Sequence, residues 1–135
     1  MSSHIAYEYS VSHSRTLARI AKAYLQVLPP EVKTLCVSGS SGVAIAAAMM
    51  AKSKRNLMLC YVPKPGERRH GYFHTPEPPV AFVDDFIASG ETLKRVRTAC
   101  RSVEIAYAIT DTDKKIKLKA ILGKTEHIWP LEGAL

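Results

Sequence analysis

Short, continuously apolar runs separated by helical segments constrain the fold of this 135-residue chain more than any other feature. Strands are expected at residues 34–37, 57–62, 80–83 and 103–109; the run at 34–37 looks like a buried strand, and the run at 57–62 is continuously apolar, as expected for a strand covered on both faces. Helices are expected between them, at residues 12–28, 43–52 and 90–100. This order predicts an α/β fold, a parallel β-sheet flanked by helices with right-handed crossovers, as one domain over residues 1–135.

The remaining segments are less regular. Residues 63–79 carry five prolines and most of a basic cluster, and so long a loop in a compact domain is usually functional. Lysines alternate with aliphatic residues over residues 114–119, which predicts an edge strand protected by charge rather than a nucleic-acid contact. A last strand is expected within residues 126–131.

Composition excludes several classes of protein. Apolar residues make up 47% of the chain, enough for a core, and no apolar run has the roughly 20 residues that span a bilayer. The first residues do not have the pattern of a signal peptide. The cysteines Cys36, Cys60 and Cys100 are odd in number and lack zinc spacing, so we expect reduced, buried thiols in a cytoplasmic protein. The histidines also lack metal-ligand spacing.

Two carboxylates and a glycine turn follow the third apolar run. Asp84 and Asp85 are neighbours, and adjacent strand residues point to opposite faces, so at least one is expected to meet solvent, a cation or hydroxyl groups. Residues 88–92 then open a helix with small side chains that let backbone N–H groups approach an anion. An acid pair beside such a turn suits a sugar phosphate. The turn alone is also compatible with an ordinary connection in which Ser89 caps the helix.

The whole segment VAFVDDFIASGETL, residues 80–93, resembles the phosphoribosyl-pyrophosphate signature of the type I phosphoribosyltransferases. The family fold is Rossmann-like, in agreement with the element order. The resemblance implies that Asp84 and Asp85 are catalytic and hold the ribose hydroxyls. It assigns the ribose 5-phosphate to Ala88, Ser89, Gly90, Glu91 and Thr92.

Two further segments match the same family. The glycine-rich turn after the first strand occupies the place of the pyrophosphate-binding loop, which implies that role for Ser38, Gly39, Ser40, Ser41 and Gly42. Residues 61–71 are similar to the catalytic loop of orotate phosphoribosyltransferases. There the resemblance implies catalytic roles for Lys64, Arg68 and His70, and pyrophosphate binding by Lys64 and Arg69. A cation on the leaving diphosphate would stabilise charge that develops in the transition state. Each segment alone could also be a capped turn or a solvated basic loop.

Two departures from the family narrow the expectation. Ala88 stands where purine-salvage members usually carry an aspartate, and alanine cannot act as an acid or base, so an orotate-like acceptor is expected over hypoxanthine or guanine. Only 33 residues precede the first expected strand, so the hood over the base is expected to be small, to come from the C-terminal tail, or to be absent. Trp129 is expected in the core rather than on a base.

The resemblance therefore implies an enzyme that moves 5-phosphoribosyl from phosphoribosyl pyrophosphate to a nitrogenous base and releases pyrophosphate. Mg²⁺ would be held largely by substrate and water oxygens, with Asp84 and Asp85 as ligands directly or through water. A cytoplasmic homodimer without membrane contact is expected. The alternative is a non-catalytic sensor of phosphoribosyl pyrophosphate or a nucleic-acid-binding regulator on the same fold, which the formal charge of +7 at pH 7 would allow.

Overall fold

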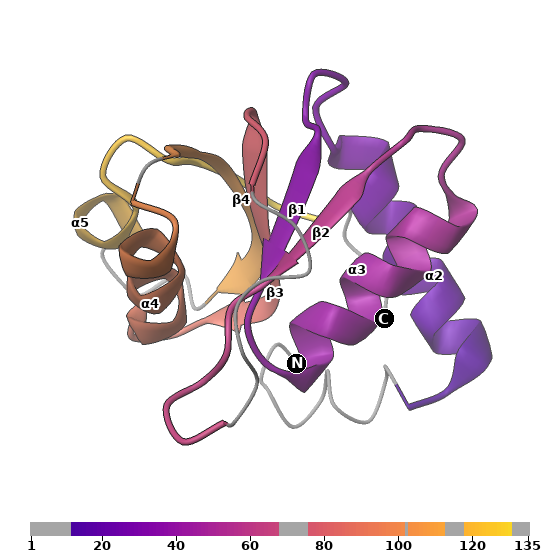
Figure 1. Cartoon of the computed structure of the whole chain (residues 1–135). Coiled ribbons are helices and arrows are strands. Elements are labelled where there is room, and N and C mark those ends of the chain that lie inside the picture. The colour runs from indigo at the N-terminus through magenta and orange to yellow at the C-terminus, as the bar shows by residue number, and fades with distance from the viewer. Residues whose placement is uncertain (1–11, 68–75, 102, 113–117, 131–135) are drawn as a thin grey trace.

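The computed structural model describes residues 12–67, 76–101, 103–112 and 118–130 (Figure 1). Its strands form one sheet in the order β2-β1-β3-β4-β5, and every neighbouring pair is parallel. The strands are β1 (Thr34–Val37), β2 (Met58–Tyr61), β3 (Val80–Ile87), β4 (Ile105–Thr112) and β5 (Glu126–Ile128). The expected α/β class with a parallel sheet is confirmed.

Helices cover both faces of this sheet (Figure 1). Helices α2 (Ser14–Val27) and α3 (Ser40–Lys52) lie on one face, and α4 (Glu91–Ala99) and α5 (Leu118–Leu122) lie on the other. Helix α2 ends just before Pro29-Pro30, because proline disfavours the helical conformation in the preceding residue and lacks a backbone N–H. None of the described helices is both long and apolar enough to cross a membrane.

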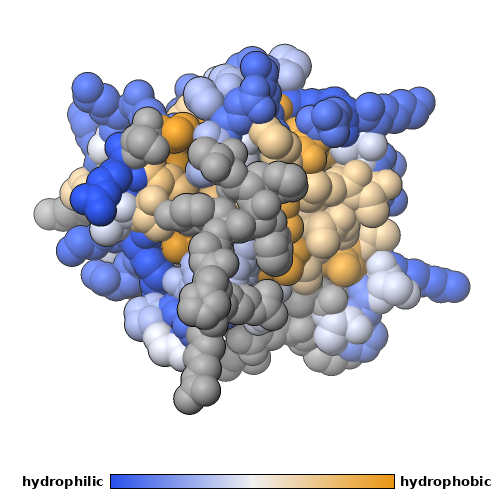
Figure 2. All heavy atoms as spheres, viewed as in Figure 1, coloured by the Kyte–Doolittle hydropathy of each residue, from blue (hydrophilic) through white to orange (hydrophobic). Residues whose placement is uncertain are grey.

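Alternation along the strands builds two hydrophobic cores. In β1, Leu35 and Val37 pack towards α2 and α3, whereas Cys36 between them packs towards α4. In β3, Val83 packs towards α2 and α3, whereas Phe82 packs towards α4. Strands buried on both faces must be apolar at every position, which is why these runs carry no polar alternation. On the face that carries the edge strand β2, apolar side chains reach the surface between two hydrophilic flanks (Figure 2).

Two expectations about local structure are corrected. The edge strand predicted for residues 114–119 is wrong at Leu118 and Lys119, which begin α5, while 114–117 lie outside the described residues. Leu118, Ile121 and Leu122 are spaced as on one helix face, and all three contact the core under α4. Trp129 is not in the core: it is 42% exposed and its ring stands edge-on to His127.

The acidic strand β3 is tied to α2 by one buried hydrogen bond. Tyr24 is fully buried, and its hydroxyl donates to the backbone carbonyl of Asp84 at 2.7 Å. Sixty residues separate the two partners in the sequence. The bond therefore fixes the backbone of β3 at Asp84 relative to the helical layer.

Tyr24→Phe is predicted to lower the free energy of unfolding by about 1–2 kcal/mol, because it leaves a buried carbonyl with one partner fewer. Urea unfolding measures the change. The matched control is Tyr107→Phe, which removes a hydroxyl bonded to the exposed Glu31 and should cost less than about 0.5 kcal/mol. Equal costs for the two variants would contradict the assignment.

Candidate functional site

A β-bulge interrupts β3 at the acid pair. Val83 pairs with Ile109 and Phe86 with Asp111, so three steps along β3 match two along β4. The extra residue falls at Asp84-Asp85. Bulges break the alternation of side chains and are common beside active sites. The expectation that the two acids point to opposite faces therefore fails, and their side chains are hydrogen-bonded to each other.

Both carboxyl groups are buried, with exposed fractions of 5% for Asp84 and 1% for Asp85. At least one of them was expected to meet solvent, a cation or hydroxyl groups; of these, contact with solvent is not observed, and backbone donors reach both carboxyls. The N–H of Asp85 donates to Asp84 Oδ1, and the N–H of Phe86 donates to Asp85 Oδ1, each at 2.8 Å. Burial, the hydrogen bond to Asp85 and the charge of Asp85 raise the pKa of Asp84 well above its ordinary value, which favours a proton on this carboxyl.

The turn after β3 presents a helix N-terminus. Gly90 has φ +85°, a left-handed conformation suited to glycine, and a Cβ there would lie 2.5 Å from Ile121 Cγ2. Gly90 is itself the N-cap of α4 and no side chain caps the helix. Ser89 is not the cap; its Oγ accepts from the Glu91 N–H at 3.4 Å. The first turn of α4 therefore offers its backbone donors at the end of the acidic strand.

The turn after β1 lies beside the acid pair. Helix α3 begins at Ser40, earlier than expected, so Ser41 and Gly42 belong to its first turn and only Ser38 and Gly39 form the connection. A Cβ at Gly42 would lie 3.0 Å from the carbonyl oxygen of Val83 and 3.7 Å from Asp84 Oδ1. The small residue lets the start of α3 pack directly against β3. The fold thus brings the two glycine turns to one edge of the sheet.

Lys64 extends over the first of these turns. A Cβ at Gly39 would lie 2.9 Å from Lys64 Cε and 3.2 Å from its Nζ, so only glycine allows this approach. The charge of Lys64 also lowers the pKa of Asp84, against the larger effect of burial. Glu67 holds the segment by accepting from the Tyr61 hydroxyl at 2.5 Å and from the Lys64 N–H at 2.9 Å.

A cavity of about 510 Å³ opens at this point. Its lining combines the start of α3 with the chain that follows β2: Gly39, Ser40, Val43, Ala44, Tyr61, Lys64 and Glu67. A backbone turn with a lysine above it can bind an anion. Three residues expected to act here, Arg68, Arg69 and His70, lie outside the described residues.

Sequence reasoning missed two side chains at this edge. Arg95 of α4 donates from Nη1 to the buried Ser38 Oγ at 2.9 Å and so links the two turns. Asp111 of β4 pairs in register with Phe86, just after the acid pair, and its Oδ1 accepts from the Thr112 N–H. The sequence indicated a helix over Gly90 to Arg95. It did not indicate that Arg95 contacts Ser38, because the two residues are 57 positions apart.

The acid pair could supply only part of the ligand set of a Mg²⁺ ion. Its donors are oxygens, which a hard cation prefers. Among the described residues, however, Asp84 and Asp85 belong to no group of three or more metal-ligating side chains close enough to enclose an ion. Mg²⁺ commonly completes such a set with substrate and water oxygens.

Comparison with known proteins identifies the fold. Neither the known protein families nor the curated proteins give a match. Among solved structures, adenine phosphoribosyltransferase from Thermoanaerobacter pseudethanolicus has a TM-score of 0.70 at 14% identity, over 89% of this chain and 82% of that one. Orotate phosphoribosyltransferase from Mycobacterium tuberculosis, in complex with 5-phospho-α-D-ribosyl 1-diphosphate, has a TM-score of 0.72 at 16% identity, over 91% of this chain and 76% of that one.

The chain has the phosphoribosyltransferase fold. A third structure, orotate phosphoribosyltransferase from Aeropyrum pernix, agrees with a TM-score of 0.61 at 19% identity, over 87% of this chain and 69% of that one. Adenine and orotate enzymes are both among these neighbours, so the likeness does not distinguish between the two acceptors.

Asp84→Asn is predicted to stabilise the protein at pH 7. The raised pKa means that folded Asp84 holds a proton which the unfolded chain releases, so wild-type stability falls as pH rises from the ordinary carboxyl range through the raised pKa. Asparagine resembles the protonated acid and avoids this loss. Thermal melting from pH 4 to 8 should show an advantage of the variant that grows with pH. Glu104→Gln, at an exposed carboxyl, is the control; a variant less stable than wild type at pH 7 would contradict the prediction.

Gly90→Ala is predicted to cost about 2–4 kcal/mol of stability, because it adds left-handed strain and drives a methyl group into Ile121. Gly66→Ala is the matched control, since Gly66 has φ +89° and nothing within 4 Å of its added Cβ. The control should cost only about 1–2 kcal/mol. Urea unfolding compares the two variants, and equal losses would show that Ile121 moves aside freely.

Proposed function

We propose that the protein is a type I phosphoribosyltransferase, which transfers 5-phosphoribosyl from its pyrophosphate to a nitrogenous base and releases pyrophosphate. The observation that carries the proposal is the bulge at Asp84-Asp85, which places two hydrogen-bonded carboxyls on the strand that leads into the N-terminus of α4. The phosphoribosyltransferase fold supports it, and the solved orotate enzyme in complex with phosphoribosyl pyrophosphate guides the choice of ligand.

In the proposed reaction each turn has a separate anion to hold. The turn from Ala88 to Thr92 binds the 5-phosphate through the backbone N–H groups that start α4. The turn at Ser38 and Gly39, with Lys64 above it, binds the diphosphate and stabilises its charge as it leaves. Arg68, Arg69 and His70 are proposed to add to this set.

The acid pair acts on the ribose. Asp84 and Asp85 accept hydrogen bonds from the ribose hydroxyls, and the negative charge of the pair stabilises the positive charge that develops on the ring as the bond at the anomeric carbon breaks. Binding of a ribose or a cation would favour the ionised form of Asp84, which burial disfavours in the free protein. Bound Mg²⁺ would neutralise charge on the diphosphate.

The acceptor is proposed to be orotate-like rather than hypoxanthine or guanine, because Ala88 cannot exchange a proton with a purine. Adenine belongs in the same screen, since adenine enzymes are among the structural neighbours. A homodimer is proposed as the active assembly, and sedimentation measures it directly.

The deciding experiment is calorimetric titration with phosphoribosyl pyrophosphate and Mg²⁺. Saturable binding is expected in wild type, with at least a tenfold loss of affinity, about 1.4 kcal/mol, in Asp84→Asn/Asp85→Asn and in Lys64→Ala. Arg55→Ala is the control, because Arg55 binds the carbonyls of Pro29, Pro30 and Val32 at the opposite end of β1. Absence of binding by folded wild-type protein would refute the proposal.

Turnover separates the enzyme from the alternative. Pyrophosphate release with orotate, adenine, hypoxanthine or guanine identifies an enzyme and its acceptor. Binding without release for any base would favour a sensor, and the formal charge of +7 at pH 7 then makes salt-dependent RNA or DNA binding the next measurement.

A further inference from the structure

Three cysteines that are far apart in the sequence meet in the core beneath α4. The sulfur atoms of Cys36, Cys60 and Cys100 all lie within 4.8 Å of one another. The sequence indicated no metal spacing, because each cysteine comes from a different element. Their convergence is a property of the fold alone.

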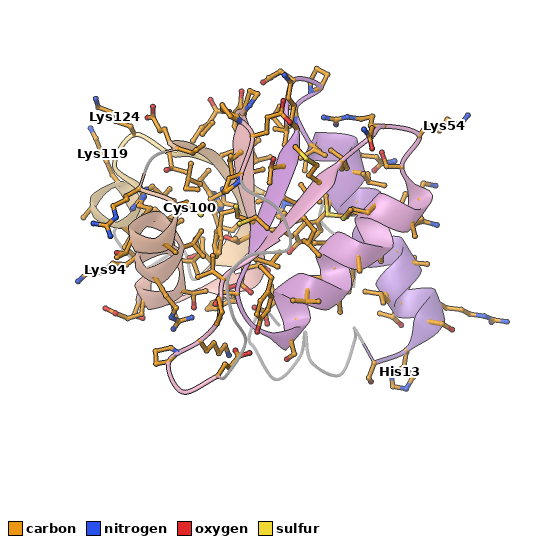
Figure 3. The ribbon with its side chains drawn as sticks, viewed as in Figure 1. His13, Lys54, Lys94, Cys100, Lys119 and Lys124 are labelled. Atoms are coloured by element: carbon orange, nitrogen blue, oxygen red, sulfur yellow. The ribbon has the colours of Figure 1, made fainter. Side chains whose placement is uncertain are left out.

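Strand register and helix position produce the convergence. Cys36 of β1 and Cys60 of β2 are direct partners in a parallel pair, so their side chains leave the same face of the sheet at the same height. Cys100 is the C-cap of α4 and lies between that helix and the sheet, whereas Lys94 and Lys119 point outward (Figure 3). The group thus joins two strands to the helix that begins at the candidate phosphate turn.

The three thiols are buried and reduced. Their exposed fractions are 0% for Cys36, 0% for Cys60 and 2% for Cys100, and none forms a disulfide. A single buried cysteine behaves as a small apolar residue, and valine or alanine could replace it. Three sulfurs facing one another form a ligand set that packing alone does not require.

The geometry points to a soft monovalent cation: we propose that Cys36, Cys60 and Cys100 form a closed three-sulfur site for Cu⁺. Thiolates select soft ions and are poor ligands for Mg²⁺ or Ca²⁺. Structural Zn²⁺ almost always takes four ligands, and in the described part of the chain the group contains only these three. Metal–thiolate bonds of about 2.3 Å would place the sulfurs about 4 Å apart, a small contraction of the observed group.

A surface cavity lies close to the cysteine group. The cavity, of about 650 Å³, lies between α4 and the chain after β2, and Val62 and Ala99 are part of its lining. Val62 lies just beyond the end of β2, Ala99 adjoins Cys100, and both pack in the core that holds the cysteines. The cavity therefore reaches residues that share a core with the three thiols.

The test is anaerobic titration of the whole chain with Cu⁺, supplied as its acetonitrile complex against a chromophoric Cu⁺ chelator. Wild type should bind one ion, with a thiolate-to-copper absorption band and a higher melting temperature. Each of Cys36→Ala, Cys60→Ala and Cys100→Ala should weaken binding by at least about 100-fold, since loss of a supporting residue alone costs 10- to 100-fold. Circular dichroism checks that each variant folds.

Met49→Leu is the matched control, because Met49 is a fully buried sulfur in the other core. It should bind Cu⁺ as wild type does. If Cys36→Ala or Cys60→Ala fails to fold, Cys100→Ala at the end of α4 decides the question. The proposal is overturned by absence of binding, by binding that survives all three substitutions, by tighter binding of Zn²⁺ than of Cu⁺, or by mass spectrometry that shows a disulfide in place of a metal-binding thiol group.

Discussion

The contact between two carboxyl groups in the middle of the sheet sets the conditions for the rest of the structure. Asp84 and Asp85 are buried on the central strand, where an isolated charge would be costly. The bulge in β3, the backbone donors of Asp85 and Phe86, and the raised pKa of Asp84 together make that burial tolerable. Helix α2 contributes through Tyr24, whose hydroxyl donates a hydrogen bond to the backbone carbonyl of Asp84 and so holds β3 at that residue. Stability is given up here for a pre-arranged polar site, as is common in binding sites.

The two glycine turns form one unit around this pair. Gly42 lets α3 approach β3, Gly39 lets Lys64 lie over the turn after β1, and Arg95 joins that turn to α4. Each contact depends either on a glycine, which has no side chain, or on a long cationic side chain. The two turns are therefore built mostly from backbone and held together by few side chains, which gives them a fixed spacing.

Much of the fold could be predicted because its cause is local. Strands covered on both faces must be apolar throughout, so β1, β2 and β3 were visible as runs, and Pro29 marked the end of α2. The acid pair and the glycine turn were also visible, because each is a pattern of residues that are neighbours in the sequence. The bulge was not, since it depends on the register with β4, and neither were the partners of Arg95 or the meeting of three cysteines. Leu118 was assigned to a strand because the alternation of lysines with aliphatic residues over 114–119 outweighed a short helical spacing.

The strand order has a consequence for how the chain assembles. Strand β3 lies between β1 and β4, so its neighbours come from before and after it in the sequence. During synthesis, the segment from α2 to β2 can pack as a local unit, but β3 then presents an unpaired edge until residue 112 has emerged. Throughout that interval Asp84 and Asp85 remain hydrated and charged at this edge, and charge discourages pairing with other chains. The two acids that the finished fold buries are thus charged groups on an open strand edge for as long as β4 is missing.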